Sequence, residues 1–155
     1  MDNPFMARAI QLSLDNVLSG NGGPFGAVIV KDGSIIAEGV NRVTAINDPT
    51  AHAEVTAIRE ACAKLGVFDL HGCEIYTSCE PCPMCLGAIY WAHPERVYFG
   101  NTAADAAKIG FDDAFIYREL DHPHASRKIP MISVMRDEAL AGFRAWEAKS
   151  DKIPY

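Results

Sequence analysis

Two short segments, each at the predicted start of a helix, constrain how this chain folds. One is residues 52–54 (His-Ala-Glu) and the other is residues 81–85 (Pro-Cys-Pro-Met-Cys). Cys82 and Cys85 are three residues apart and therefore share one helix face. The positive end of a helix favours thiolates, and proline costs little in the first turn of a helix. An imidazole and two thiolates form a donor set suited to a zinc ion.

Two interpretations of this donor set are open. With His52, Cys82 and Cys85 as the ligands, one tetrahedral position is free for a water molecule that zinc activates, and Glu54 is the expected proton carrier. Residues two apart on a regular helix point in different directions, so His52 must lie at the very start of its helix for both side chains to reach the metal. The alternative is a closed structural zinc site with Cys79 as fourth ligand, which leaves Glu54 without a role.

The hydrophobic pattern predicts one domain over residues 1–155, with alternating helices and strands. The fold class is a three-layer α/β/α sandwich around a mixed, about five-stranded sheet. We expect helices at about 5–18, 50–65, 82–91, 112–120 and 137–148, and strands at 26–31, 35–39, 74–77, 96–100 and 131–135. A hairpin turn at Asp32-Gly33 joins the first two strands, a polar loop covers 41–50, and Gly66 ends the second helix. The helix between the strands at 74–77 and 96–100 implies that these strands are parallel.

Composition and charge exclude several classes of protein. Hydrophobic residues make up 49% of the 155 residues, too many for a disordered chain. No apolar run approaches the ~20 residues of a membrane-spanning helix, so we expect no membrane partner. The net charge of −6 counts against a nucleic-acid partner, which a basic surface would indicate. The first residues lack the features of a signal peptide, and the odd number of cysteines is typical of a reducing compartment, so we expect a cytoplasmic protein.

Several segments together resemble the cytidine deaminase superfamily and, within it, the small bacterial-type guanine deaminases. The segments 23–27 (Gly-Pro-Phe-Gly-Ala), 47–54 and 77–92 are shared loosely with cytosine deaminases and transfer-RNA adenosine deaminases. The segment 110–113 (Gly-Phe-Asp-Asp) and the closing Tyr155 favour the guanine deaminases. The resemblance implies a cytidine deaminase-like fold and one zinc ion per subunit, held by His52, Cys82 and Cys85.

The activity implied by this resemblance is hydrolytic deamination of guanine to xanthine and ammonia. A zinc-activated water is the nucleophile and Glu54 is the proton shuttle. The alternatives are a deaminase of cytosine, cytidine or transfer-RNA adenosine, and a non-catalytic binding module stabilised by zinc. The module differs from the enzymes because changing Glu54 would then have no effect.

The expected partner is a small purine base, and six residues are candidates for binding it: Asn41, Phe25, Ala53, Trp91, Asp113 and Tyr155. Each has a plainer interpretation as a turn asparagine, a core residue, a first-turn acid or a frayed terminus. Asp113 suits the N1–H donor of guanine. The resemblance suggests that residues 150–155 form a tail that covers a site. In a homodimer, the tail of one subunit would cover the site of its partner. The remaining histidines, His71, His93, His122 and His124, are interpreted as surface residues.

Overall fold

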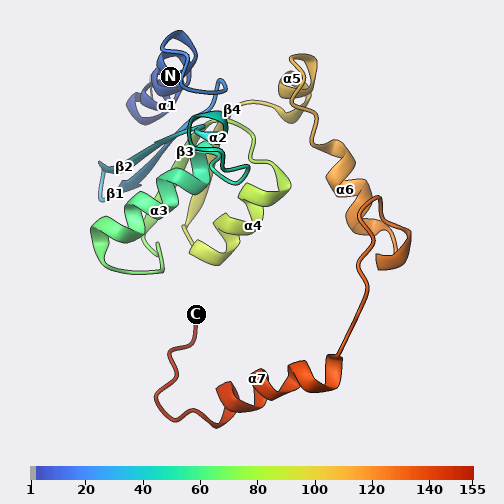
Figure 1. Cartoon of the computed structure of the whole chain (residues 1–155). Coiled ribbons are helices and arrows are strands. Elements are labelled where there is room, and N and C mark those ends of the chain that lie inside the picture. Colours follow the sequence, from blue (N-terminus) through green and yellow to red (C-terminus); the bar gives the residue numbers. More distant parts are fainter. Residues whose placement is uncertain (1–2) are drawn as a thin grey trace. The chain divides into compact units, whose positions relative to one another are not determined.

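A mixed four-stranded sheet with strand order β2-β1-β3-β4 forms the centre of the fold. Its strands are β1 (Gly26–Lys31), β2 (Ser34–Val40), β3 (Cys73–Cys79) and β4 (Arg96–Asn101) (Figure 1). β1 is antiparallel to both β2 and β3, whereas β3 and β4 are parallel, as the helix between them predicts. The computed structural model describes residues 3–155.

The turn between β1 and β2 confirms the predicted hairpin. Asp32 and Gly33 have φ angles of 49° and 72°, so both residues adopt the left-handed conformation that a tight two-residue hairpin requires. The hairpin makes β2 an edge strand and places β1 in the interior of the sheet. Every residue of β1 except Lys31 is buried.

Helices cover both faces of the sheet. The helix α1 (Pro4–Leu18) covers the face that carries Val28, Val30 and Tyr76. The helices α3 (Ala53–Leu65) and α4 (Pro83–Ala92) pack on the opposite face, in a core that includes Ile29 and Ile75 (Figure 1). This arrangement confirms the three-layer α/β/α class.

The helix α3 lies unusually close to the edge strand because β2 carries a glycine at the contact. A Cβ atom at Gly39 would lie 2.2 Å from the carbonyl oxygen of Ala53 and 2.5 Å from the amide nitrogen of Ala57. Any side chain at this position would force the helix away from the sheet. α3 ends as predicted at Gly66, whose φ of 68° is left-handed.

The predicted strand at 131–135 is wrong, and the sheet has four strands rather than about five. Residues 131–134 have no regular secondary structure. A strand needs a neighbouring strand to pair its backbone groups, and Phe115–Tyr155 forms a separate unit in which no strand is described. Two short α-helices were not predicted: α2 (Val43–Ile46) within the expected polar loop, and α5 (Ala103–Lys108) after β4. The Thr102 and Asp105 side chains form a capping box that starts α5.

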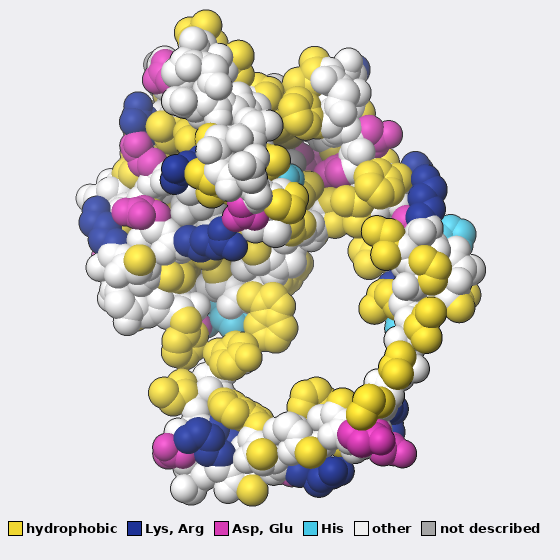
Figure 2. Space-filling view, viewed as in Figure 1, with side chains coloured by type: hydrophobic (Ala, Val, Ile, Leu, Met, Phe, Trp, Pro, Cys, Tyr) yellow, Lys and Arg dark blue, Asp and Glu magenta, His cyan; other side chains and the backbone are white. Residues whose placement is uncertain are grey.

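The first compact unit ends at Ala114, and the second spans Phe115–Tyr155. The second contains nearly all of α6 (Ala114–Asp121), a short 3-10 helix η1 (His124–Ser126) and α7 (Arg136–Ala148). None of the residues from Phe115 to Tyr155 is buried. Hydrophobic side chains lie along α7 in Figure 2, and Phe143 is 76% exposed. No helix among the described residues has the length and apolar character needed to cross a membrane.

Candidate metal centre and active site

His52 and Glu54 occupy the first positions of α3. His52 is the N-cap residue with an extended backbone (φ −72°, ψ 160°), and Glu54 is in the first turn. The change from extended to helical backbone after His52 lets two side chains only two residues apart serve the same site, which a regular helix would prevent. The placement matches the expectation that His52 lies at the very start of its helix.

Cys82 and Cys85 occupy the corresponding positions of α4. Cys82 is the N-cap residue, Pro83 follows at the first helical position, and the Cys85 backbone N–H donates a hydrogen bond to Cys82 Sγ at 3.5 Å. Proline is tolerated there because the first N–H groups of a helix have no partner within the helix. The start of α4 thus presents two sulfur atoms and a backbone donor.

The three donor atoms have the spacing of a tetrahedral zinc site. With Zn–S bonds of ~2.3 Å and Zn–N bonds of ~2.0–2.1 Å, a sulfur and a nitrogen ligand lie about 3.6 Å apart. Nδ1 of His52 lies 3.5 Å from Sγ of Cys82 and 3.5 Å from Sγ of Cys85. The donor types and distances fit one zinc ion with three protein ligands.

The pKa values of the three donor residues also favour the binding of a cation. A hydrogen bond from the Cys85 thiol lowers the pKa of Cys82 to about 4, and the same contact raises the pKa of Cys85, with burial and the Glu54 charge adding to it. The hydrogen bond with Cys82 raises the pKa of His52. In the absence of an ion, two sulfur atoms and an imidazole therefore share protons that a divalent cation would replace.

Glu54 is buried beside this donor set. Its Oε1 accepts a hydrogen bond from Thr77 Oγ1 at 3.3 Å, and its Oε2 accepts one from Cys85 Sγ at 3.4 Å. Burial raises the pKa of Glu54, and a raised pKa suits a carboxyl group for proton transfer near neutral pH. Sequence reasoning missed Thr77, although its place as a polar residue on the same face of β3 as Ile75 was a usable signal.

Cys79 stands outside the group of converging donors. The described donors that lie within 4.8 Å of one another here are His52, Cys82 and Cys85. The Cys79 thiol instead lies 3.8 Å from the carbonyl oxygen of Thr102, and burial raises its pKa to about 11. The structure therefore gives no support to the closed four-ligand alternative.

Asn41 is buried at the end of β2, and its side-chain oxygen is engaged by the protein itself. Oδ1 accepts hydrogen bonds from the backbone N–H of Val43 at 3.2 Å and of Gly23 at 3.5 Å. In the part of the chain that the structure describes, the side-chain nitrogen Nδ2 donates no hydrogen bond to protein. Asn41 thus offers a ligand a donor, rather than the donor and acceptor that the sequence suggested.

Asp113 lies close enough to Cys82 and His52 for their charges to affect one another's pKa values. Burial raises its pKa, and the negative charge of Cys82 adds to this, while the charge of Asp113 contributes to the raised pKa of His52. Phe25 packs edge-to-face against Phe111 with ring centroids 5.0 Å apart, so this aromatic pair anchors the segment that carries Asp113. Phe111 was not singled out from the sequence as a site residue.

The side chains of the other three candidates, Ala53, Trp91 and Tyr155, are not brought to the metal donors within the first unit. Ala53 is fully buried under the contact with Gly39, so only its backbone can serve a ligand. Trp91 is 67% exposed near the far end of α4, which puts it about 13 Å along the helix axis from Cys82. The first unit therefore does not bring Trp91 to the donor set. Tyr155 is exposed in the second unit.

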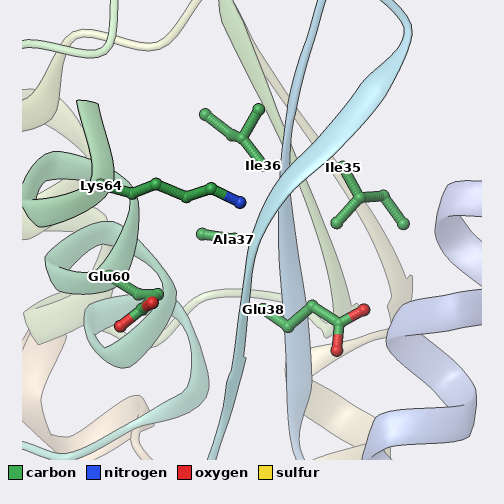
Figure 3. Close-up of a pocket in the computed structure, with 6 residues that line it drawn as sticks. All are labelled: Ile35, Ile36, Ala37, Glu38, Glu60 and Lys64. Atoms are coloured by element: carbon green, nitrogen blue, oxygen red, sulfur yellow. The ribbon is translucent and has the colours of Figure 1, made fainter.

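A separate hollow of about 370 Å³ lies between β2 and α3 (Figure 3). Ile36 and Ala37 lie toward the helix that carries Glu60 and Lys64, whereas Ile35 and Glu38 lie on the other side of β2, as the figure shows. The consecutive pair shares one side because the β1–β2 register shifts at this point. It contains none of the metal donors or substrate-binding candidates, so the chemistry is not assigned to it.

The comparisons with known proteins agree with this geometry. Residues 1–101 match the cytidine and deoxycytidylate deaminase zinc-binding region, and the chain belongs to this family of zinc-dependent deaminases. It is 58% identical over 151 residues to the guanine deaminase of Bacillus subtilis (strain 168), covering 97% of each chain. A crystal structure of B. subtilis guanine deaminase superposes with a TM-score of 0.96 at 57% identity, covering 100% of this chain and 99% of the other. A tRNA-specific adenosine deaminase of Aquifex aeolicus is 42% identical over 68% of each chain.

Replacing Cys82 by alanine should abolish zinc binding, whereas Cys79→Ala should leave it intact. Cys82 belongs to the group of converging donors, while the Cys79 thiol lies against the backbone carbonyl of Thr102. Elemental analysis after gel filtration should give about one zinc per chain for the wild type and Cys79→Ala, and almost none for Cys82→Ala. Zinc loss from Cys79→Ala in a folded protein would contradict the three-ligand site.

Proposed function

We propose that this protein is a zinc-dependent hydrolase that converts guanine and water to xanthine and ammonia. The observation that carries the proposal is the buried Glu54, 3.4 Å from the Cys85 sulfur within the His52, Cys82 and Cys85 group. This places a proton carrier beside a three-ligand metal site, which a purely structural site does not need. The likeness to guanine deaminases over nearly the whole chain supports guanine as the substrate.

Different residues of the chain bind the metal, transfer protons and position the proton-transferring group. His52, Cys82 and Cys85 would hold the zinc ion, which when bound would make a water molecule a nucleophile at neutral pH. Glu54 accepts a proton from that water and delivers it to N3 of the base, next to the carbon that bears the amine. The hydroxyl of that water adds to C2, and Glu54 then takes the remaining hydroxyl proton and passes it to the amine. The C2–N bond breaks as the C2 carbonyl forms, and the amine leaves as ammonia. Thr77 holds the carboxylate in place through Oε1 and leaves Oε2 toward the reacting groups.

Recognition of the base follows from the remaining groups. Asp113 accepts the N1–H of guanine, a donor that adenine and cytosine lack at the corresponding position. Asn41 donates through Nδ2 to an acceptor atom of the base. Phe25 borders the ring, and the backbone of Ala53 lies at the start of α3. Trp91 and Tyr155 complete the site only if other parts of the assembly bring them there.

The substitution Glu54→Gln should lower kcat for guanine by about 10³-fold while zinc stays bound, because the amide cannot carry the proton. Ammonia release is measured with the zinc-loaded protein, with cytosine and a transfer-RNA anticodon hairpin as parallel substrates. Turnover of another substrate but not guanine would keep the zinc chemistry and reject guanine. No turnover of any substrate, with zinc bound, would favour a non-catalytic module.

The substitution Asp113→Asn should lower kcat/KM for guanine by roughly 10²-fold, since the charged acceptor for N1–H is lost. The neighbouring Asp112 is a matched control, because its carboxylate caps α6 by accepting the Ala114 backbone N–H at 2.9 Å. Asp112→Asn should keep kcat/KM near the wild-type value. Equal effects of the two substitutions would argue against a specific role for Asp113.

We propose further that the protein acts as a cytoplasmic homodimer, in purine breakdown, on a free base rather than on nucleic acid or at a membrane. All five cysteines are free, which suits a reducing compartment. Residues 1–155 form one deaminase domain in this proposal, with residues 150–155 as a tail exchanged between subunits. The apolar residues exposed in the second unit, among them Ile153 (67%) and Tyr155 (79%), need such cover.

Deleting residues 153–155 should reduce kcat/KM by tenfold or more, and a mixed dimer should recover part of it. The dimer pairs a truncated chain that keeps Glu54 with a full-length Glu54→Gln chain, isolated through two different tags. Under exchange, the intact glutamate receives the partner's tail, and the dimer has about half of the wild-type activity.

The matched control is a dimer of one wild-type chain and one chain with both changes. Exchange predicts that this control is inactive, because its one intact Glu54 lacks a tail. The reverse pattern would show that each tail serves its own chain. Full activity of the truncated homodimer would show that the tail has no part in the site.

A further inference from the structure

A second group of metal-binding side chains lies away from the deaminase centre. Donor atoms of Asp69, His71 and His93 lie within 4.8 Å of one another. Asp69 and His71 belong to the loop between α3 and β3, whereas His93 is the C-cap residue of α4. This group was not predicted from the sequence, since each histidine on its own has the pattern of a surface residue.

The two imidazoles face one carboxylate. Nδ1 of His71 contacts Asp69 Oδ1, and Nδ1 of His93 lies 3.3 Å from Asp69 Oδ2. The rings stack with centroids 5.5 Å apart and an interplanar angle of 30°. Two ligands bound to a zinc ion at ~2.0–2.2 Å in tetrahedral geometry lie about 3.3–3.5 Å apart, so small side-chain shifts would bring all three donors onto one ion.

The backbone already fixes the distance between the two segments. The N–H of Leu70 donates to the carbonyl of Ala92 at 2.7 Å, and the N–H of Glu95 donates to the carbonyl of Cys73 at 2.8 Å. These bonds join the residues that flank His71 to those that flank His93, and Leu70 and Cys73 are fully buried. The donors therefore project from a rigid frame, which lowers the entropy cost of binding an ion.

The group is also open enough to bind an ion. The side chains of His71, His93 and Asp69 are 74%, 46% and 35% exposed. Water can therefore complete the coordination of an ion bound there. His93 has a left-handed backbone with φ 54°, a conformation that is uncommon for residues other than glycine, and its side chain lies toward Asp69.

We propose that Asp69, His71 and His93 form a second cation site, for a divalent transition-metal ion of the zinc, copper or nickel type. Two imidazole nitrogens and one carboxylate suit these ions, whereas calcium and magnesium require oxygen ligands. The site is independent of the proposed deaminase activity. An ion there links the end of α4 to the loop before β3.

The test titrates Zn²⁺ alone into the full-length protein already loaded with one zinc, by isothermal calorimetry at neutral pH. The wild type should bind a second equivalent, and Zn²⁺ at tenfold its Kd should raise Tm by about 3–5 °C. The double variant His71→Asn, His93→Asn should lose both the second equivalent and the rise in Tm. A matched control, His122→Asn with His124→Asn, removes two exposed histidines of the second unit and should keep both.

Guanine turnover without added Zn²⁺ verifies that each variant is folded, because none of these histidines is among the proposed catalytic groups. Cys82→Ala should lose the first equivalent of zinc and keep the second. Saturation of the wild type at one zinc per chain would overturn the proposal. Retention of the second equivalent by the His71 and His93 double variant, or its loss from the control variant, would also overturn it.

Discussion

The close contact of α3 with the sheet determines where the chemistry lies. The register places Gly39 opposite Ala27, Ala27 opposite Thr77 and Thr77 opposite Phe99. Gly39 and Ala27 are the small residues of this row, and they let the first turn of α3 approach the sheet closely. Glu54 can then reach Thr77, its hydrogen-bond partner on β3. The position of the buried Glu54 carboxylate thus depends on two positions that have almost no side chain.

The second constraint is electrostatic. The donor set brings two sulfur atoms, an imidazole and a buried carboxylate together at the starts of two helices. Without an ion, these groups must share protons, and the pKa values of Cys82 and Cys85 move in opposite directions. A divalent cation removes this conflict, so metal binding contributes to the stability of the folded unit as well as to its chemistry.

The sequence predicted those features that depend on local signals. The hairpin at Asp32-Gly33, the helix end at Gly66 and the parallel pair of β3 and β4 all follow from turn chemistry and element order. The metal donors could also be predicted from the sequence, because His52 and the two cysteines Cys82 and Cys85 lie in short motifs at helix starts. The strand at 131–135 was predicted wrongly, since its apolar pattern says nothing about whether a neighbouring strand is available to pair with it.

Other features depend on contacts between residues that are distant in the sequence. Thr77 is a polar residue on the same face of β3 as Ile75, but its partner Glu54 lies 23 residues earlier in the chain, on α3. His71 and His93 are brought together by the loop before β3 and the end of α4. The engagement of Asn41 Oδ1 by the Gly23 and Val43 backbone likewise appears only in three dimensions.

The helix α4 carries chemically different groups at its two ends. Its N-cap is Cys82, whose sulfur favours the thiolate form, and its C-cap is His93, beside Asp69. The peptide dipoles of the helix are aligned, so the anionic sulfur of Cys82 lies at their positive end, which favours it. Opposite ends of one ten-residue helix thus hold two separate groups of side chains able to ligate a metal. Local unfolding of this helix would disturb both groups together.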